Sequence, residues 1–170
     1  MDGNSELTVE EVEPVCCSKG EMYLNVGLQA FAYLLAALAL LKRPRRFLVW
    51  LIGMIVNFTA LRMNTCMNCV YYGKDCHLGW GLITARMFQR TKEPDPELFR
   101  KRFPINFGAL MFVLLYPIPE MRHNRMLLVP YIATLMAMNL AIPFACRKCG
   151  MNDVCPMGER VVNSFEAFGR

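Results

Sequence analysis

Four long apolar stretches dominate the pattern of hydrophobic and polar positions along the chain. They cover residues 22–41, 47–61, 103–119 and 126–145, and none of them contains Asp, Glu, Lys or Arg. A helix needs about 20 apolar residues to cross a hydrocarbon core of about 30 Å, and a charge at its centre is costly. We therefore predict an all-α integral membrane protein with four transmembrane helices. The second and third stretches are short for a span.

The composition agrees with a lipid bilayer as the surroundings of this chain. Hydrophobic residues make up 55% of the sequence and charged residues 19%, which is less charge than a soluble domain usually carries. The acidic residues 1–21 lack the basic start and the early apolar core of a cleavable signal peptide. We expect the first helix to stay in place as the insertion signal.

The second half of the chain repeats the first at an offset of about 80 residues. The repeated positions include one cysteine triplet in each half: Cys66, Cys69 and Cys76 match Cys146, Cys149 and Cys155. Each unit reads as helix, basic turn, helix and cysteine loop, so the chain is predicted to be two duplicated helical hairpins in a parallel repeat. Both cysteine loops then lie on one membrane face, and the basic turns 42–46 and 120–125 lie on the other.

The duplication divides the chain into five segments. These are an N-terminal tail (1–21) with Cys16 and Cys17, repeat 1 (22–81), an amphipathic and linker segment (82–102), repeat 2 (103–158) and a C-terminal tail (159–170). The third segment is predicted to form a short amphipathic helix at the membrane surface, followed by a turn where Pro94 and Pro96 oppose helix. A similar surface helix is expected in the C-terminal tail.

The cysteine spacings, C-x2-C-x6-C and C-x2-C-x5-C, are typical of thiolate metal sites. A C-x2-C pair places two soft ligands on one ion, and such ligands select zinc, copper(I) or iron–sulfur clusters. Each triplet needs a fourth ligand, which Cys16 and Cys17 would supply for two sites; one site shared by both halves is also chemically possible. His77 is a further candidate, but its match in the other half is Pro156, so it lies outside the duplicated pattern.

The loop CRKCGMNDVCP, residues 146–156, resembles part of the iron–sulfur loop of helix-hairpin-helix DNA glycosylases. That loop ends in C-x2-C-x5-C after an upstream cysteine. The upstream cysteine at its usual spacing, the helix-hairpin-helix and the catalytic parts of the family are absent here. The resemblance implies that the spacing suits a [4Fe–4S] cluster and implies no binding of nucleic acid.

Other roles for the cysteines remain open. The chain has eight cysteines, an even number, and these would pair as disulfides in an oxidising compartment. Structural zinc is another alternative, since it needs only four thiolates. The 13 methionines and the cysteine pairs resemble features of small copper or mercury transporters. No cysteine lies in an apolar stretch, however, so no path of thiolates crosses the bilayer. Palmitoylation of juxtamembrane cysteines would explain Cys16 and Cys17 but not two C-x2-C loops.

Polar and aromatic residues near the spans have simpler interpretations. Four amides in the apolar stretches are expected to form interhelical hydrogen bonds: Gln29, Asn57, Asn106 and Asn139. Three aromatic residues near the first triplet are expected to form an interfacial belt, or else to shield a cluster from water: Tyr71, Tyr72 and Trp80.

The basic residues do not give one orientation for the membrane. The turns hold 6 of the 19 Lys and Arg residues and the predicted cysteine face holds 13, which favours a cytoplasmic cysteine face. The flanks of the first helix alone favour the opposite orientation. Since no nucleophile with a base and no phosphate-binding loop is evident, we predict an electron-transfer or accessory subunit with iron–sulfur centres, working beside other membrane redox subunits, rather than an enzyme.

Overall fold

The computed structural model of the chain describes residues 18–90, 93–149, 155–159 and 161. Its elements are α1 (Lys19–Leu40), α2 (Pro44–Val56), the π-helical turn η1 (Asn57–Leu61), α3 (Arg62–Cys66), α4 (Trp80–Met87), α5 (Pro96–Leu115), α6 (Ile118–Met121) and α7 (Arg125–Lys148). No strand occurs among these residues. The prediction of an all-α chain is confirmed.

Four helical segments are long and apolar enough to cross a membrane, by length and composition. They are Lys19–Leu40, Pro44–Cys66, Pro96–Met121 and Arg125–Lys148. The expectation that the second and third spans are short is wrong, because these segments have 23 and 26 residues. Four such helices are compatible with a multi-pass membrane protein.

The two lengthened spans begin at prolines. Pro44 and Pro96 each open a helix, where a missing N–H costs nothing and the fixed φ suits the helix. Asp95 caps the second of these helices, since its side chain accepts a hydrogen bond of 2.9 Å from the backbone N–H of Leu98. Residues 96–102 therefore belong to α5, and the prediction that Pro96 opposes helix there is wrong.

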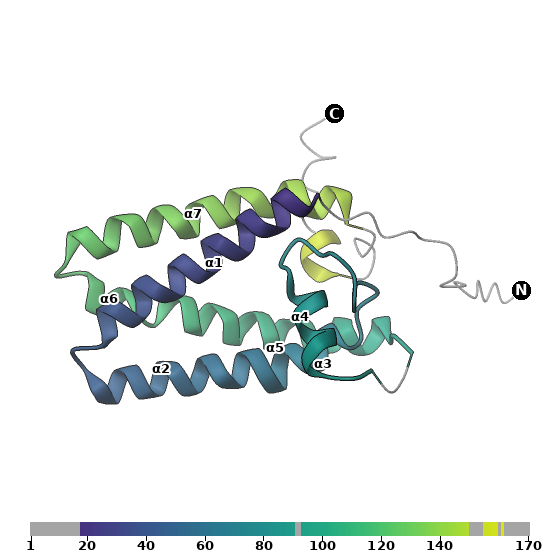
Figure 1. Cartoon of the computed structure of the whole chain (residues 1–170), viewed down its shortest axis with the longest axis horizontal. Coiled ribbons are helices and arrows are strands. Elements are labelled where there is room, and N and C mark those ends of the chain that lie inside the picture. Colours follow the sequence, from purple (N-terminus) through teal and green to yellow (C-terminus); the bar gives the residue numbers. More distant parts are fainter. Residues whose placement is uncertain (1–17, 91–92, 150–154, 160, 162–170) are drawn as a thin grey trace, which may run out of the picture.

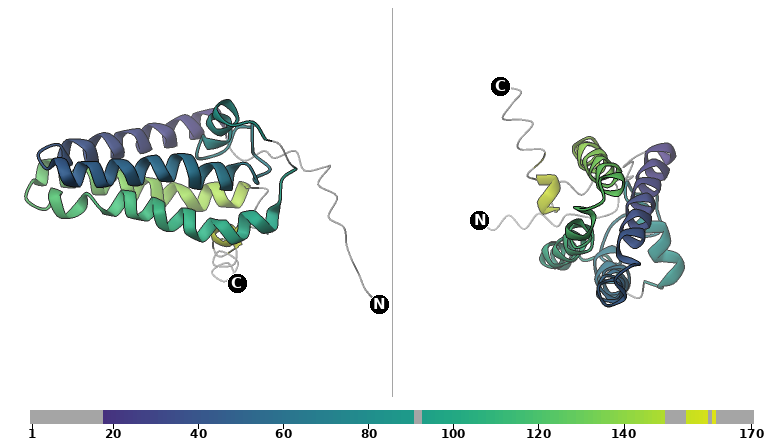
Figure 2. Two further views of the ribbon diagram at one scale, coloured as in Figure 1. Left: turned by 90° about the horizontal axis from the view of Figure 1, so that it is seen from below. Right: turned by 90° about the vertical axis from the view of Figure 1, so that its left-hand side faces the viewer.

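The four long helices form an antiparallel bundle (Figure 1). Helix α1 lies beside α7, and α2 lies beside α5, as a second view also shows (Figure 2). The turns that join α1 to α2 and α6 to α7 lie at one end of the bundle. The loop between α3 and α4, the start of α5 and the end of α7 lie at the other end, which we call the cysteine end.

Most of the apolar surface of the long helices points outward. Only 11% of the most apolar window of Arg125–Lys148 is buried inside the bundle. Large side chains such as Leu34, Ile52 and Val129 are more than half exposed. Soluble monomers rarely expose an apolar surface that is so continuous, so this surface is suited to contact with lipid.

A compact core and ion pairs stabilise the end of the bundle opposite the cysteines. Two aromatic side chains reach backbone carbonyls there: Trp50 Nε1 donates to Val113 O at 3.0 Å, and Tyr131 Oη donates to Leu114 O at 2.5 Å. Glu120 joins the two turns, because it forms ion pairs with Arg43, at 2.8 Å, and with Arg46. The two turns are therefore fixed to one another.

The buried amides depart from expectation. Asn57 is fully buried, and neither of its side-chain polar atoms has a hydrogen-bond partner among the described residues. Asn139 donates to Leu135 O of its own helix, at 2.8 Å. Gln29 does accept a hydrogen bond from another element, from Trp80 Nε1 at 3.1 Å. The prediction of interhelical hydrogen bonds therefore holds for Gln29 and is wrong for Asn139.

Three predictions fall on the tails. Cys16 and Cys17 lie outside the described residues. The surface helix expected in the C-terminal tail also lies outside them, apart from residues 159 and 161.

Candidate metal centre

The six described cysteines gather at the cysteine end of the bundle, and all are partly buried thiols. Cys66 ends α3, and Cys69 and Cys76 lie in the loop between α3 and α4. Cys146 lies in the last turn of α7, Cys149 follows that helix, and Cys155 directly precedes the helical turn 156–159. Helix ends therefore position both C-x2-C pairs. Cys66 and Cys146 belong to the helices themselves.

The two cysteine triplets meet around one aromatic pair. Tyr71 and Phe99 are 3% and 7% exposed. Two cysteines from each triplet pack against them: Cys69, Cys76, Cys149 and Cys155. The structure thus brings together four predicted site residues that are up to 86 positions apart in the sequence.

Tyr71 and Trp80 do not form an interfacial belt. Tyr71 is buried against the cysteines, and Trp80 stacks on Phe58 with ring centroids 4.5 Å apart. The interpretation as a belt is wrong for Tyr71, because its ring covers thiols inside the protein. The alternative, that an aromatic side chain shields the thiols from water, agrees with this placement.

Backbone N–H groups point at three of the sulfur atoms. Gly81 N donates to Cys76 Sγ at 3.3 Å. The backbone of Tyr71 donates to Cys69, and the backbone of two residues, Met157 and Gly158, donates to Cys155. Such bonds favour the charged form of the sulfur, and hydrogen bonds to ligand sulfurs also tune iron–sulfur clusters. Both halves of the chain provide this feature.

Glycines allow the first cysteine loop to close on itself. Gly79 has φ of +73°, and a Cβ atom there would lie 2.5 Å from Val26 Cγ2. A Cβ atom on Gly81 would lie 2.2 Å from the carbonyl oxygen of Tyr71. Gly79 therefore lets the chain turn after the third cysteine. Gly81 has a further role, since only glycine brings its N–H so close to Cys76.

Arg90, which lies outside the first cysteine loop, stabilises that loop by hydrogen bonds. Its Nε donates to Met67 O at 2.7 Å, and its Nη2 donates to Cys69 O at 2.5 Å. The guanidinium also lies 4.6 Å from the ring centre of Tyr72. This residue belongs to the segment 82–102, which was predicted to begin with a short amphipathic helix at the membrane surface. Helix α4 does form, but it ends at Met87, and the chain beyond it folds back onto the loop.

Burial keeps the thiols protonated in the absence of metal. It raises the pKa of Cys69 to about 12, and it also raises the pKa of Cys155. Thiolates, not thiols, bind metals. Metal binding at this end must therefore release protons.

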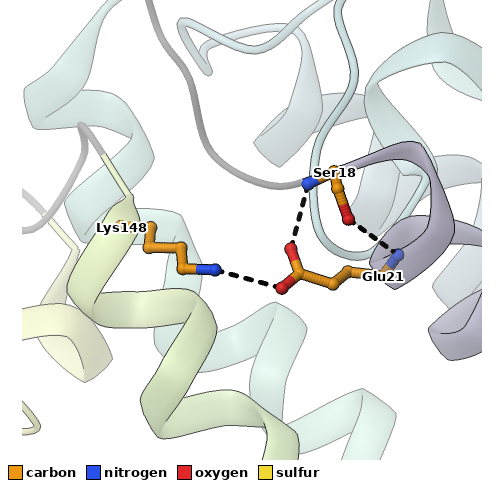
Figure 3. A network of polar contacts seen from close by, with 3 residues as sticks. All are labelled: Ser18, Glu21 and Lys148. Atoms are coloured by element: carbon orange, nitrogen blue, oxygen red, sulfur yellow. Dashed lines mark hydrogen bonds and ion pairs between the residues drawn. The ribbon is translucent and has the colours of Figure 1, made fainter.

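His77 lies apart from the grouped cysteines. Its imidazole lines a pocket of about 240 Å³ between α1 and α7, and no cysteine lines that pocket. At the rim, Glu21 Oε1 accepts a hydrogen bond from Lys148 Nζ at 3.0 Å and Glu21 also completes a capping box with Ser18 (Figure 3). Partial burial lowers the pKa of His77, so the imidazole is neutral at pH 7.

The thiols share one end of the bundle without forming a finished coordination shell. No three described His, Cys, Asp or Glu side chains are arranged so that they could hold a metal ion. The chain matches no protein-family model, no curated protein and no solved structure.

Proposed function

We propose that the chain is a membrane metalloprotein whose cysteine end holds an iron–sulfur centre. It would pass single electrons at the membrane surface, as a small subunit beside other membrane redox proteins. The observation that carries this proposal is the convergence of Cys69, Cys76, Cys149 and Cys155 on one buried aromatic pair. Four thiolates are the usual ligand set of a [4Fe–4S] cluster.

Three further features support the proposal. Backbone N–H groups already point at sulfurs from both halves of the chain. Four helices that are long and apolar enough to cross a membrane would hold the site next to lipid, where a redox partner in the membrane would reach it. The predicted duplication into two hairpins would explain why each half brings one triplet to the same end.

Structural zinc is the second candidate, and the same four thiols favour it. Tetrahedral zinc needs four cysteines and no redox chemistry. The chain would then be an assembly or scaffold protein of the membrane. Disulfides and soft-metal transport have no comparable support from this grouping.

We place the cysteine end in the cytoplasm. A reducing compartment keeps thiols available for a cluster, and the basic residues outside the turns favour that orientation. An impermeant thiol reagent applied to intact cells tests it on the variant Lys74→Cys, because Lys74 is exposed in the first cysteine loop: the new thiol should stay unlabelled until the membrane is opened. Labelling before the membrane is opened would reverse the orientation.

Metal analysis of anaerobically purified full-length protein tests the proposed function. We expect a brown protein with broad absorption near 400 nm and about four irons per chain. A colourless protein with one zinc per chain would replace iron–sulfur by the zinc alternative. A protein that takes up neither metal would refute both.

Two variants locate the centre. Cys69→Ser and Cys149→Ser each remove one thiol of the group of four, one from each half, and each should lose the iron and the colour. Thr59→Ala is the control, since Thr59 lies in η1 and donates only to Ile55 O of its own helix, at 2.7 Å. Full metal content in both cysteine variants would contradict a site at this position.

A further inference from the structure

Arg62 is a buried positive charge beside the cysteine end. It begins α3 directly after the π-helical turn η1, and it is 3% exposed. Its Cζ lies 4.4 Å from the ring centre of Trp80 and 5.6 Å from that of Phe58. Single π-helical turns within helices are frequent at functional sites.

The described residues offer Arg62 no carboxylate partner. None of the ion pairs among residues 18–90, 93–149, 155–159 and 161 includes Arg62, and its Nε has no hydrogen-bond partner there. Contact with aromatic rings offsets only part of the cost of burying a cation. A buried guanidinium in this position therefore calls for an anion.

The groups whose negative charge would act on Arg62 include two cysteine sulfurs. Cys66 lies one helical turn further on in α3. Cys76 Sγ accepts a hydrogen bond from the backbone N–H of Gly81, the residue after Trp80, and the guanidinium of Arg62 lies against the ring of Trp80. Thiolates are strong anions only when something holds them deprotonated. A bound metal does this, and four thiolates around a divalent ion or a cubane leave the centre negatively charged.

We propose that Arg62 is the buried counter-charge of a negatively charged metal–thiolate centre at the cysteine end. This inference rests on the proposed function. Arg62 is a positioning residue that acts through Cys76, one of the four thiols of the proposed centre, and it stabilises the more negative state of the centre. For a redox centre, each one-electron reduction adds one electron and one negative charge, so Arg62 raises the midpoint potential.

The buried positive charge of Arg62 has no counterpart in the second half of the chain. At the offset of about 80 residues, the position equivalent to Arg62 is Ile142. The second triplet therefore has no equivalent cation from its own half. A centre between the halves would have its positive neighbour on the side of the first triplet.

Redox titration with dithionite tests the proposal, using full-length protein reconstituted with iron and sulfide. Arg62→Gln should keep its iron and show a midpoint potential lower by about 59 mV or more, which is a tenfold change in a one-electron equilibrium. Arg100→Gln is the matched control. It removes the same charge at the same end, but from a side chain that is 60% exposed, and its potential should equal that of the wild type.

Two further measurements keep the proposal testable if Arg62→Gln does not fold or if the native metal is not redox-active. Arg62→Lys retains the charge and should keep the potential near the wild-type value. The affinity of metal-free protein for Co²⁺, followed by thiolate-to-cobalt absorption, should fall about tenfold in Arg62→Gln. An unchanged potential and an unchanged Co²⁺ affinity, or an equal shift in Arg62→Lys, would overturn the role of Arg62. Wild-type protein that binds neither iron nor Co²⁺ would instead refute the proposed function.

Discussion

The backbone N–H of Gly81 donates to Cys76 Sγ at 3.3 Å, and the carbonyl oxygen of Gly81 accepts from Gly73 N at 3.1 Å. A single glycine thus joins the start of α4 to the sulfur of the third cysteine and to the middle of the loop. No side chain fits at this position, because two backbone oxygens lie within 3 Å of where a Cβ atom would be.

Gly81→Ala should therefore open the first cysteine loop. Overpacking of this kind costs about 1–3 kcal/mol, and we expect lower thermal stability together with a loss of bound metal. Gly27→Ala is the matched control: it lies in α1, where a Cβ atom meets nothing within 4 Å. That variant should gain about 0.4–1 kcal/mol and keep its metal. Equal metal content in the two variants would contradict the role of Gly81.

Arg90→Gln should weaken the hold on the loop without removing any thiol. The substitution removes charge-assisted hydrogen bonds to Met67 O and Cys69 O, and bonds to charged groups are worth about 1.5–3 kcal/mol each. We expect a chelator to remove the metal about tenfold faster or more. Arg86→Gln changes an exposed arginine of α4 and should release metal at the wild-type rate. The same rate in both variants would show that Arg90 does not secure the loop.

The helices could be predicted from the sequence because the apolar stretches contain no charge. Their ends could not, since Pro96 was expected to oppose helix but opens one instead. A proline is compatible with the first position of a helix and with a turn, and its sequence neighbours do not decide between them. Asp95 before Pro96 was the signal for a helix start, since aspartate is a preferred N-cap.

The spacing and the repeat predicted that the cysteines of both triplets lie at one end of the bundle, whereas their surroundings could not be predicted. The hydrogen bonds of Arg90 cross 21 and 23 positions of sequence, so only tertiary packing creates them. Two features of the sequence pointed weakly to a special role for Arg62. It directly follows the second apolar stretch, and its equivalent in the other half is the apolar Ile142. A charge that breaks an internal repeat marks a difference between the halves.

The stability of the metal-free protein should fall as the pH rises from about 9 to about 12. Burial raises the pKa of Cys69 to about 12 from an ordinary value near 9.0, so the folded state holds this proton more tightly than the unfolded state. The stabilisation is complete below pH 9 and is lost as the pH rises towards 12, with a slope of at most about 1.4 kcal/mol per pH unit. Anaerobic denaturation in detergent from pH 8 to pH 11 measures it. Cys69→Ala should show a flatter profile, and identical slopes would exclude Cys69 as the cause.

The double variant Cys16→Ser/Cys17→Ser distinguishes one shared centre from two. Two four-cysteine sites would need the tail cysteines as fourth ligands, so the variant would lose iron. A single centre on Cys69, Cys76, Cys149 and Cys155 needs nothing from the tail, and packing of these four on one aromatic pair makes this the expected result.

Iron per chain, measured on the same preparation as the midpoint potential, decides the outcome. We expect about four irons in both the wild type and the tail variant, with one unchanged potential. The double variant Cys69→Ser/Cys149→Ser should retain no iron. About eight irons in the wild type, falling in the tail variant, would replace the shared centre by two separate ones. In that case, the grouping around Tyr71 would bring two clusters close together, and only the one beside Arg62 should respond to Arg62→Gln.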